Sequence, residues 1–431
     1  MEKTLKILSI STSDTEGGAA RAMYRIHTSI GIQGIDSSVL VKNKVSLDKR
    51  VIPISQFEGE PNFVKNVTEY IENKIKNKIQ HYQWSKYPKR ENVFMSDLRA
   101  VSINNALQKL PYDILHLHWF NLRYLDITEL TKINKPIVWT LHDSWAFTGI
   151  CHIFYQCNKY TKSCGNCPLL HSNKENDLSR KIWQKKKNIY EDLKLHVVTP
   201  SEWLADAARN SSLLNKFLIS VIPNPIDTEL YSPGNSFIDK EKLNLNKNKK
   251  YLLFGAHNAI KDKNKGFNLL QKAIEEIRGI DTKHELVLLV FGNDNFTENI
   301  EIKIPVTFLN YLHSEADIIS AYRAADVMIV PSLSETFGQT ASEAMACGTP
   351  VVAFNCTGIK EVVSHKETGY LAEVYNPVDL AKGIIWCIDN NIDNKLSINA
   401  RKRVEERYSM EKIGIEYCTL YKNIYQKKID L

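Results

Sequence analysis

The chain has 431 residues, which is too long for one compact core and predicts two domains of about 200 residues each. Hydrophobic residues make up 43% of the sequence and charged residues 24%, which excludes an intrinsically disordered or fibrous chain. The net charge of +7 is too small to indicate nucleic-acid binding, so we expect no nucleic-acid partner.

The N-terminal apolar stretch, residues 5–12, is followed by Asp14 and lacks the longer apolar region and cleavage site of a signal peptide. We therefore interpret it as a buried strand. No apolar run approaches the roughly 18 residues that are needed to span a bilayer. These features predict a cytoplasmic protein.

Short apolar runs, typical of buried strands, alternate with helical patterns along the whole sequence. In the first half we predict strands at residues 5–12, 38–41, 114–119, 137–142, 196–200 and 220–223, and helices at 19–33 and 98–110. In the second half we predict strands at 251–255, 286–292, 306–309, 327–331 and 351–354, and helices at 267–278, 315–324, 340–346, 378–389 and 411–427. This alternation is typical of an α/β fold with parallel sheets.

The pattern is interrupted once, by a polar stretch that contains three prolines. It divides the sequence into a first Rossmann-like domain at 1–225, a linker at 226–248, a second Rossmann-like domain at 249–408 and a helix at 409–431 that packs back on the first domain. Ligands of doubly wound sheets bind at the carboxyl ends of the strands, so we expect the two domains to face each other across a cleft.

Residues 327–354 predict a strand, a loop, a helix and a second strand. Backbone N–H groups of Phe337, Gly338, Gln339 and Thr340 would point out of the helix start at a strand end, where they suit a diphosphate. A carboxylate lies on each side of them, Glu335 before the helix and Glu343 within it. Carboxylates accept hydrogen bonds from hydroxyl groups, so sugar and ribose are natural partners.

The stretch from Pro331 to Ala353 reads Pro-Ser-Leu-Ser-Glu-Thr-Phe-Gly-Gln-Thr-Ala-Ser-Glu-Ala-Met-Ala-Cys-Gly-Thr-Pro-Val-Val-Ala. It resembles the donor-site motif of retaining GT-B-fold glycosyltransferases of family four, of the bacterial exopolysaccharide and lipopolysaccharide type. The resemblance implies that Glu335 binds the transferred sugar and Glu343 the ribose of a nucleotide-sugar donor. It also places Thr336 and the four N–H groups in the donor site.

Further positions carry the same resemblance. Gly17 and Gly18 precede a helix, where the family has a loop that closes over donor phosphate and acceptor. His142 ends a predicted strand, where a family histidine contacts the transferred sugar. For His116 and His118, which share one face of a strand, we predict a packing role.

Two deviations from the family concern the donor. Lys265 matches the family lysine that neutralises the leaving diphosphate, but the family arginine nearby is missing. Lys261 or Lys263 would replace it, without the bidentate fork of arginine. Asn310 stands where the family usually places a glycine that touches the base.

Four of the eight cysteines are close together in the stretch 151–171, an insert of the first domain. Cys151, Cys157, Cys164 and Cys167 end in a Cys-x-x-Cys pair, which fits a structural zinc ion with four thiolate ligands. Four reduced thiols in a packed insert are the alternative. We expect no catalytic metal, because the sequence contains no Asp-x-Asp pair.

Apolar residues recur every four positions between Phe63 and Ile79, with Lys65, Lys74, Lys76 and Lys78 among them. A basic amphipathic helix that lies on the inner face of the membrane is one interpretation, and an ordinary surface helix is the other.

Taken together, these features predict a retaining glycosyltransferase, a hexosyltransferase of polysaccharide biosynthesis. It would move a sugar from a nucleoside diphosphate sugar to a hydroxyl of a glycan or lipid-linked glycan. Two alternatives are a nucleotide-sugar epimerase of the same fold and a non-catalytic binding protein that zinc stabilises.

Overall fold

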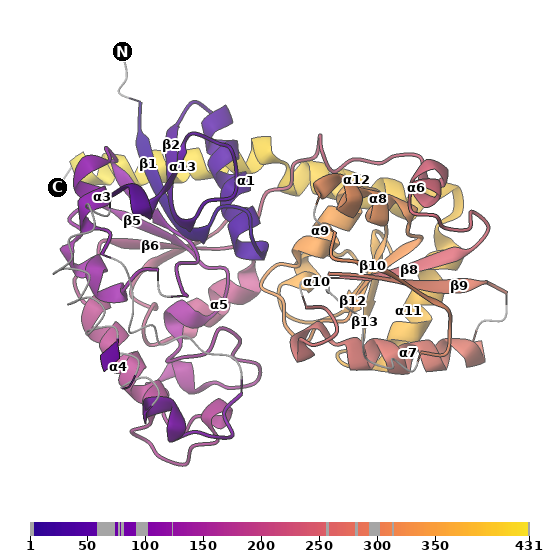
Figure 1. Ribbon diagram of the computed structural model, residues 1–431, viewed down its shortest axis with the longest axis horizontal. Helices are drawn as coiled ribbons and strands as arrows, with labels where there is room; N and C mark the ends of the chain where they lie inside the picture. Colours follow the sequence, from indigo (N-terminus) through magenta and orange to yellow (C-terminus); the bar gives the residue numbers. More distant parts are fainter. Residues whose placement is uncertain are drawn as a thin grey trace. The chain divides into compact units, whose positions relative to one another are not determined.

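The computed structural model describes residues 4–57, 74–75, 78, 82–91, 102–122, 124–255, 258–280, 283–292, 302–312 and 314–429. The chain divides into two compact units (Figure 1). The first unit comprises Met1–Ile222 and Gly414–Leu431, and the second comprises Pro223–Ile413.

A seven-stranded sheet forms the centre of the first unit. Its strands are β1 (Lys6–Ser13), β2 (Asp36–Asn43), β3 (Val51–Pro53), β4 (Ile114–Leu117), β5 (Ile137–Thr140), β6 (Leu195–Thr199) and β7 (Leu218–Val221). They lie in the order β3-β2-β1-β4-β5-β6-β7, and every neighbouring pair is parallel. The order reverses direction between β1 and β4, which is the point where ligands of doubly wound sheets bind.

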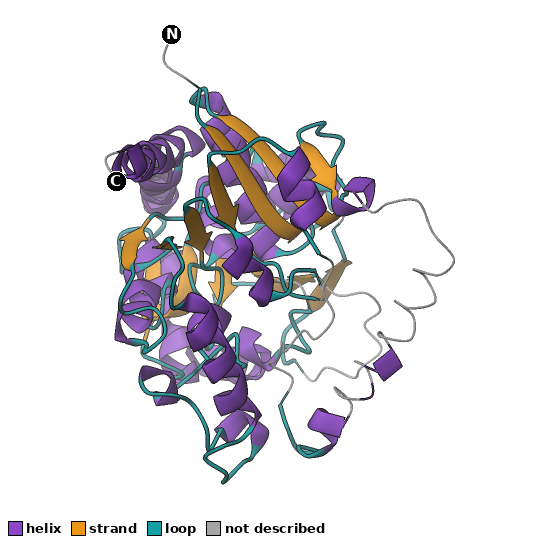
Figure 2. Cartoon of the chain, turned by 90° about the vertical axis from the view of Figure 1, so that its left-hand side faces the viewer, coloured by secondary structure: helices purple, strands orange, loops and turns teal. Residues whose placement is uncertain are grey.

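Helices of the first unit lie along this sheet. They are α1 (Gly18–Ile32), α3 (Asn104–Lys109), α4 (Leu178–Tyr190) and α5 (Glu202–Asn210), and Figure 2 shows the strands side by side with helices next to them. The starts of α4 and α5 are fixed by capping side chains, because Asp177 accepts from the N–H of Arg180 and Ser201 accepts from the N–H of Leu204.

The second unit contains a six-stranded parallel sheet of the same winding. Its strands are β8 (Lys250–Gly255), β9 (Leu286–Phe291), β10 (Val306–Asn310), β11 (Val327–Val330), β12 (Val351–Phe354) and β13 (Gly369–Ala372). They lie in the order β10-β9-β8-β11-β12-β13, so β8 and β11 flank the point of reversal. Its helices are α6 (Ser236–Lys242), α7 (Phe267–Ile280), α8 (Glu315–Ala324), α9 (Gln339–Ala346), α10 (Ile359–Val362), α11 (Pro377–Asn390) and α12 (Lys395–Tyr408).

Two parallel sheets with helices between many of the successive strands confirm the predicted α/β fold. The stretch 226–248 differs from the prediction, since it contains α6 and belongs to the second unit instead of forming a linker. Asn235 caps α6 by accepting from the N–H of Phe237, and Lys242 on α6 donates to Ser320 on α8. The prolines and the Gly-Asn pair of this stretch precede α6, and they do not form an open connection between the units.

The helix α13 (Met410–Ile429) begins in the second unit and continues into the first from Gly414 onward. Within the first unit, Tyr417 and Tyr421 of α13 are fully buried and hydrogen-bond to Thr140 and His116 of the sheet. The apolar spacing of this helix therefore corresponds to a buried face.

None of the helices in the described part of the chain is long and apolar enough to cross a membrane. The amphipathic pattern between Phe63 and Ile79 lies outside the described residues except for positions 74, 75 and 78, as does the first part of the helix predicted at 98–110.

Candidate active site

The loops that follow β8 and β11 bring together the charged residues of the second unit. Lys265 follows β8, Glu335 follows β11, and both loops lie where the strand order reverses. Nζ of Lys265 donates to Oε1 of Glu335 at 2.8 Å. Burial disfavours the charge of Lys265, but Glu335 more than offsets this, so the pKa of Lys265 is raised. Both side chains are largely buried, Lys265 being 23% and Glu335 18% exposed.

Lys265 is held in place by the turn in which it lies. Asp262 caps this turn by accepting from the N–H of Asn264, and the buried Asn264 side chain donates to the carbonyl of Ser334. Gly266 follows in a left-handed conformation with φ of 70°. A Cβ at Gly266 would lie 1.9 Å from the carbonyl oxygen of Pro331, so only glycine lets this turn lie against the end of β11.

We expect Gly266→Ala to lower the free energy of unfolding by about 2 kcal/mol, because the added Cβ meets backbone and the left-handed conformation disfavours alanine. Urea unfolding measures the effect. Gly279→Ala is the matched control: Gly279 lies in the last turn of α7 with open space around its Cβ position, so this change should be neutral or stabilising by about 0.5 kcal/mol. Equal losses in both variants would contradict the prediction.

Glu335 is fixed through its own backbone. Its N–H donates to Oγ1 of Thr357 at 3.1 Å, and its carbonyl accepts from the N–H of Gly358 at 2.9 Å. Both partners belong to the turn after β12, which the sequence did not mark as part of the site. Their contribution is to hold the Glu335 carboxylate at the strand ends.

The start of α9 has the geometry of an anion site. Gly338 caps the helix with φ of 100°, and a Cβ there would lie 3.1 Å from Ile359. The N–H groups of the first turn have no partner within the helix. The Phe337 side chain is buried against Tyr408 in an edge-to-face contact, so only the backbone of Phe337 is available to a ligand. Thr336, Gln339 and Thr340 are half-buried around this start.

Glu343 lies deeper in the fold than Glu335. It is fully buried on α9, and its Oε2 accepts from the hydroxyl of Tyr322 at 3.0 Å. The two carboxylates therefore differ in this structure, because Glu335 reaches solvent and Glu343 does not. Glu343 therefore lies on the buried side of α9, and its contact with a ribose stays a prediction.

The two lysines proposed as replacements for the missing arginine are exposed. Lys261 and Lys263 lie on the surface of the turn before Lys265. Within the described residues, Lys265 alone among the three is seen paired with Glu335. Asn310 adopts the left-handed conformation, with φ of 56°, at the end of β10. The glycine expected from the family suits that backbone, and asparagine tolerates it.

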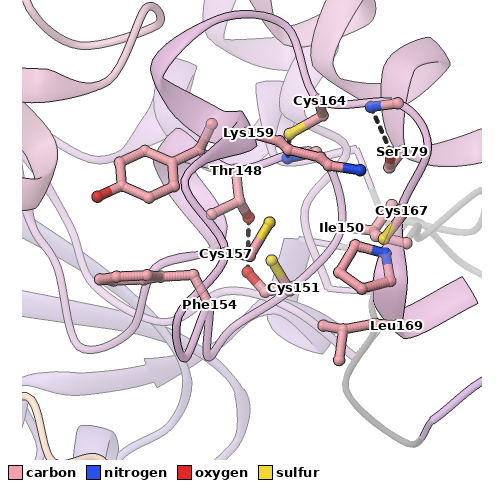
Figure 3. Close-up of a pocket in the computed structure, with 14 residues that line it drawn as sticks. Thr148, Ile150, Cys151, Phe154, Cys157, Lys159, Cys164, Cys167, Leu169 and Ser179 are labelled. Atoms are coloured by element: carbon pink, nitrogen blue, oxygen red, sulfur yellow. Dashed lines mark hydrogen bonds between the residues drawn. The ribbon is translucent and has the colours of Figure 1, made fainter. Parts of the chain in front are cut away.

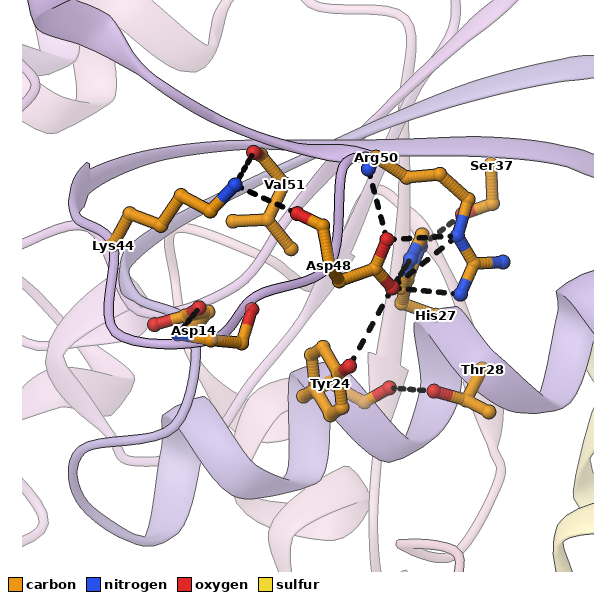
Figure 4. Close-up of polar contacts among 10 residues, drawn as sticks. Asp14, Tyr24, His27, Thr28, Ser37, Lys44, Asp48, Arg50 and Val51 are labelled. Carbon is orange, nitrogen blue, oxygen red and sulfur yellow. Dashed lines mark hydrogen bonds and ion pairs between the residues drawn. The ribbon is translucent and has the colours of Figure 1, made fainter.

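In the first unit, Gly17 caps α1 with φ of 92° and has open space around its Cβ position, and Gly18 begins the helix. The helix itself is anchored by polar contacts near Asp48 (Figure 4). The hydroxyl of Tyr24 donates to Asp48 at 3.4 Å, and His27 hydrogen-bonds to Ser37 at 2.7 Å. Hydrogen bonds from Arg50 hold the pKa of Asp48 well below its usual range.

His142 lies two residues beyond the end of β5, in a small pocket lined by aromatic side chains of the β4 and β5 loops. The neighbouring Asp143 accepts from the indole N–H of Trp119 at 2.9 Å and from the N–H of Trp145 at 2.8 Å. Nε2 of His142 lies 3.0 Å from Nδ1 of His118. The predicted packing role of His118 thus includes a direct hydrogen bond to the candidate histidine.

Burial lowers the pKa of His27 and His142 to about 4 and that of His116 to about 3. An unfolded histidine keeps a pKa near 6.5, so below that pH the unfolded chain binds protons that the folded chain does not. We therefore expect the free energy of unfolding to fall as the pH is lowered from 6.5 towards 4. Urea unfolding at pH 7 and pH 5 tests this, and greater stability at pH 5 would contradict it.

The four clustered cysteines line one pocket (Figure 3). The N–H of Gly149 donates to Sγ of Cys164 at 3.2 Å, and burial raises the pKa of Cys151 to about 12 and that of Cys164 to about 11. All four are free thiols. Across the described ranges, however, no group of three or more histidine, cysteine, aspartate or glutamate side chains is arranged to hold a metal ion.

The zinc site therefore stays a prediction, which would require the thiols to turn together within their shared pocket. We expect about one zinc ion per chain in the purified protein, measured by inductively coupled plasma mass spectrometry. Cys164→Ser should lose the zinc and lower the melting temperature, since a bound structural metal contributes to folding. Wild-type protein that binds no zinc, even when refolded with it, would contradict the prediction.

Lys186 is a feature that sequence reasoning missed. Its side chain is completely buried on α4, and its Nζ donates to the carbonyls of Trp145, Thr148 and Gly149. The same ammonium group lies 3.6 Å from the centre of the Trp145 ring. Lys186 thereby fixes the loop that connects His142 to the cysteine pocket. Its place in a lysine-rich helix gave no sign of this burial.

Comparison with known proteins identifies two consecutive domains. Residues 17–230 match the family model described as Glycosyltransferase Family 4, and residues 235–403 match the model described as Glycosyl transferases group 1. The chain belongs to these glycosyltransferase families. The boundary between the two matched regions, at residues 230–235, lies near the division between the two units after Ile222.

Relatives of this glycosyltransferase differ in the share of the chain they match. It is 30% identical to N-acetyl-alpha-D-glucosaminyl L-malate synthase from Bacillus anthracis over 36% of its own chain, a match that spans only 42% of that relative. It is 25% identical to the putative colanic acid biosynthesis glycosyl transferase WcaC from Escherichia coli K12, over 73% of this chain and 76% of that protein.

Among solved structures, Anabaena Alr3699/HepE in complex with UDP and glucose has a TM-score of 0.62 to this glycosyltransferase. The alignment covers 97% of this chain and all of that one, with 18% identity. At this identity the likeness shows the fold, and it confirms the predicted two-domain GT-B class.

Proposed function

We propose that this glycosyltransferase moves a sugar from a nucleoside diphosphate sugar to a hydroxyl of a glycan or a lipid-linked glycan. The observation that carries the proposal is the ion pair between Lys265 and Glu335, 2.8 Å long, beside the start of α9. It joins a cation suited to a leaving diphosphate with a carboxylate suited to sugar hydroxyls. HepE, solved with UDP and glucose, supports a donor of this class.

The reaction exchanges one bond at the anomeric carbon. The bond to the diphosphate oxygen breaks, the bond to the acceptor oxygen forms, and the acceptor proton passes to the leaving diphosphate. Lys265 and the N–H groups at the start of α9 stabilise the negative charge that develops on that diphosphate. Glu335 accepts hydrogen bonds from the transferred sugar.

The finer parts of the proposal concern stereochemistry and pathway. We assign retention at the anomeric carbon, which the resemblance of residues 331–353 to the donor-site motif of retaining glycosyltransferases supports. We assign transfer of a hexose in surface polysaccharide assembly, and the likeness to WcaC, a putative colanic acid biosynthesis glycosyl transferase, supports the polysaccharide role. A lipid-linked acceptor would bring the protein to the inner face of the membrane, which sedimentation with anionic liposomes would measure.

Donor binding and sugar transfer can be tested one after the other. A thermal-shift screen of UDP-, GDP- and ADP-sugars identifies the donor, because a ligand at about 100 times its dissociation constant stabilises the folded chain by about 2.7 kcal/mol. Release of nucleoside diphosphate with the best donor then measures activity, and NMR of the product gives its anomeric configuration.

The outcomes separate the competing functions. Acceptor-dependent release of nucleoside diphosphate with a retained anomer supports the proposal. An inverted product refutes retention, and conversion of the donor to its epimer without an acceptor indicates the epimerase. Binding of no donor, or binding without any turnover, indicates a non-catalytic protein.

A further inference from the structure

The segment 333–335 of the second unit is held by turns that follow three other strands of its sheet. The N–H of Leu333 donates to the carbonyl of Asn264, after β8, at 2.8 Å. The carbonyl of Leu333 accepts from the hydroxyl of Tyr375, after β13, at 2.9 Å. The N–H of Glu335 donates to Oγ1 of Thr357, after β12, at 3.1 Å. These contacts determine where the Glu335 carboxylate lies.

Tyr375 adopts a backbone conformation that disfavours tyrosine. Its φ of 59° is left-handed, and it is the third residue of a turn in which the N–H of Asn376 donates to the carbonyl of Glu373 at 3.1 Å. Glycine or asparagine is the usual residue where a turn requires a positive φ. The turn is fixed from behind, because the N–H of Glu373 donates to Asp379 at 2.7 Å. Backbone strain that the surroundings maintain in this way is typical of functional sites.

The side chain of Tyr375 is 38% exposed, so it does not fill a core. Its ring meets that of Phe354 edge to face, with centroids 5.8 Å apart and planes at 83°. The thiol of Cys356 lies 3.9 Å from the carbonyl of Leu333 and is a weak donor, so the tyrosine hydroxyl is the stronger partner of that carbonyl. Thr357 is also left-handed, with φ of 49°. Both side chains that reach the segment from the turns after β12 and β13 therefore lie on strained backbone.

We propose that Tyr375 is a positioning residue that holds the segment 333–335, and with it the Glu335 carboxylate, in place for the donor sugar. The inference rests on the proposed function, in which Glu335 accepts hydrogen bonds from the transferred sugar. A carboxylate that is already in position loses less conformational freedom when the reaction reaches its transition state. Tyr375 acts through Glu335 and needs no contact with the substrate. Glycine would suit the turn, but it has no hydroxyl for the carbonyl of Leu333.

The order of this segment is measurable without any activity. In the unliganded full chain, Tyr375→Phe removes only the hydroxyl and should raise amide hydrogen exchange of residues 333–335 about fivefold, the factor expected for one hydrogen bond. The melting temperature should stay within about 1 °C of the wild type, because this hydrogen bond is exposed and water replaces it. Unchanged exchange would overturn the inference and leave the proposed glycosyl transfer untouched.

A comparison of two backgrounds tests whether Tyr375 acts through Glu335. In the otherwise wild-type chain, Tyr375→Phe should lower kcat about fivefold and leave KM for the donor within about twofold. In the Glu335→Gln background the same change should lower kcat by less than about twofold, because the carboxylate that Tyr375 positions is already gone. An equal factor in both backgrounds would show that the hydroxyl acts independently of Glu335 and would overturn the inference.

Tyr375→Gly separates the side chain from the turn. If residue 375 only shaped the turn, glycine would serve at least as well, since its backbone favours a positive φ. We instead expect kcat to fall by at least about fivefold. Lys366→Gly is the control for relief of strain alone, because Lys366 is exposed and left-handed, with φ of 62°, in the turn before β13. It should leave kcat unchanged, whereas full activity in Tyr375→Gly would contradict the positioning role.

The matched control for the hydroxyl is Tyr251→Phe. The hydroxyl of Tyr251 donates to the carbonyl of Asn246 at 3.0 Å, in the same unit but at the start of β8. Its removal should change neither the exchange of residues 333–335 nor kcat, and the inference fails if Tyr251→Phe reproduces the effects of Tyr375→Phe. A wild type that releases no nucleoside diphosphate from any donor contradicts the proposed function instead, and the exchange measurement then decides the hold on the segment by itself.

Discussion

Glu335→Gln should lower kcat/KM for the sugar donor about a thousandfold, the scale seen when one preorganised group is removed from a transition-state site. Glutamine keeps the size of the side chain but removes the charge that pairs with Lys265 at 2.8 Å. The ammonium of Lys265 then loses its fixed position, and the sugar loses a carboxylate acceptor. Both effects act on the same bond-breaking step, so we expect the loss mainly in kcat.

Nucleoside diphosphate release at several donor concentrations measures this effect. Glu367→Gln is the matched control, because Glu367 is an exposed glutamate of the same unit, between β12 and β13, and should leave the kinetics unchanged. Lys265→Arg keeps the charge and should retain more activity than Lys265→Met. A loss below tenfold in Glu335→Gln would show that this carboxylate does not contact the reacting sugar.

The second large effect concerns Lys186, whose ammonium donates to three backbone carbonyls inside the first unit. Lys186→Met keeps much of the volume but cannot donate, so three buried acceptors and the face of Trp145 lose their partner. We expect the free energy of unfolding to fall by about 3 kcal/mol. Lys181→Met, an exposed position on the same helix, should change it by less than about 0.5 kcal/mol.

The pH dependence of the unfolding free energy gives an independent check of the burial of Lys186. Burial lowers the pKa of Lys186 to about 7, whereas an unfolded lysine keeps a pKa near 10.4. Between these values the unfolded wild-type chain binds a proton that the folded chain has released, so the stability contributed at Lys186 rises with pH. The difference in unfolding free energy between wild type and Lys186→Met should therefore grow from pH 7 to pH 9. A difference that shrinks over this range would contradict the burial of Lys186.

The sheets and the donor-site loop could be predicted from the sequence for a physical reason. Strands of a parallel sheet are buried on both faces, so they appear as unbroken apolar runs, such as those that became β11 and β12. The helix predicted at 340–346 corresponds to α9, which begins one residue earlier at Gln339. A glycine that must adopt positive φ, Gly338, marks this start in the sequence itself.

What the sequence did not reveal depends on contacts between distant residues. Lys265 and Glu335 were each selected, but their ion pair joins residues 70 positions apart. Burial of Glu343 follows from Tyr322 on another helix, and burial of Lys186 follows from the path of the loop after β5. Likewise, α6 has too short an apolar pattern to stand out, and its packing against α8 makes it part of the second unit.

The path of α13 has a consequence for the order in which the chain folds. The hydroxyl of Tyr421 bonds to His116 across 305 residues of sequence, and Tyr417 bonds to Thr140 across 277. During synthesis, the sheet of the first unit leaves the ribosome long before these tyrosines are made. His116 and Thr140 therefore lack these hydrogen-bond partners until the whole second unit has been translated. We expect the first unit to be the last to reach its native packing, and its nascent form to be the one that chaperones bind.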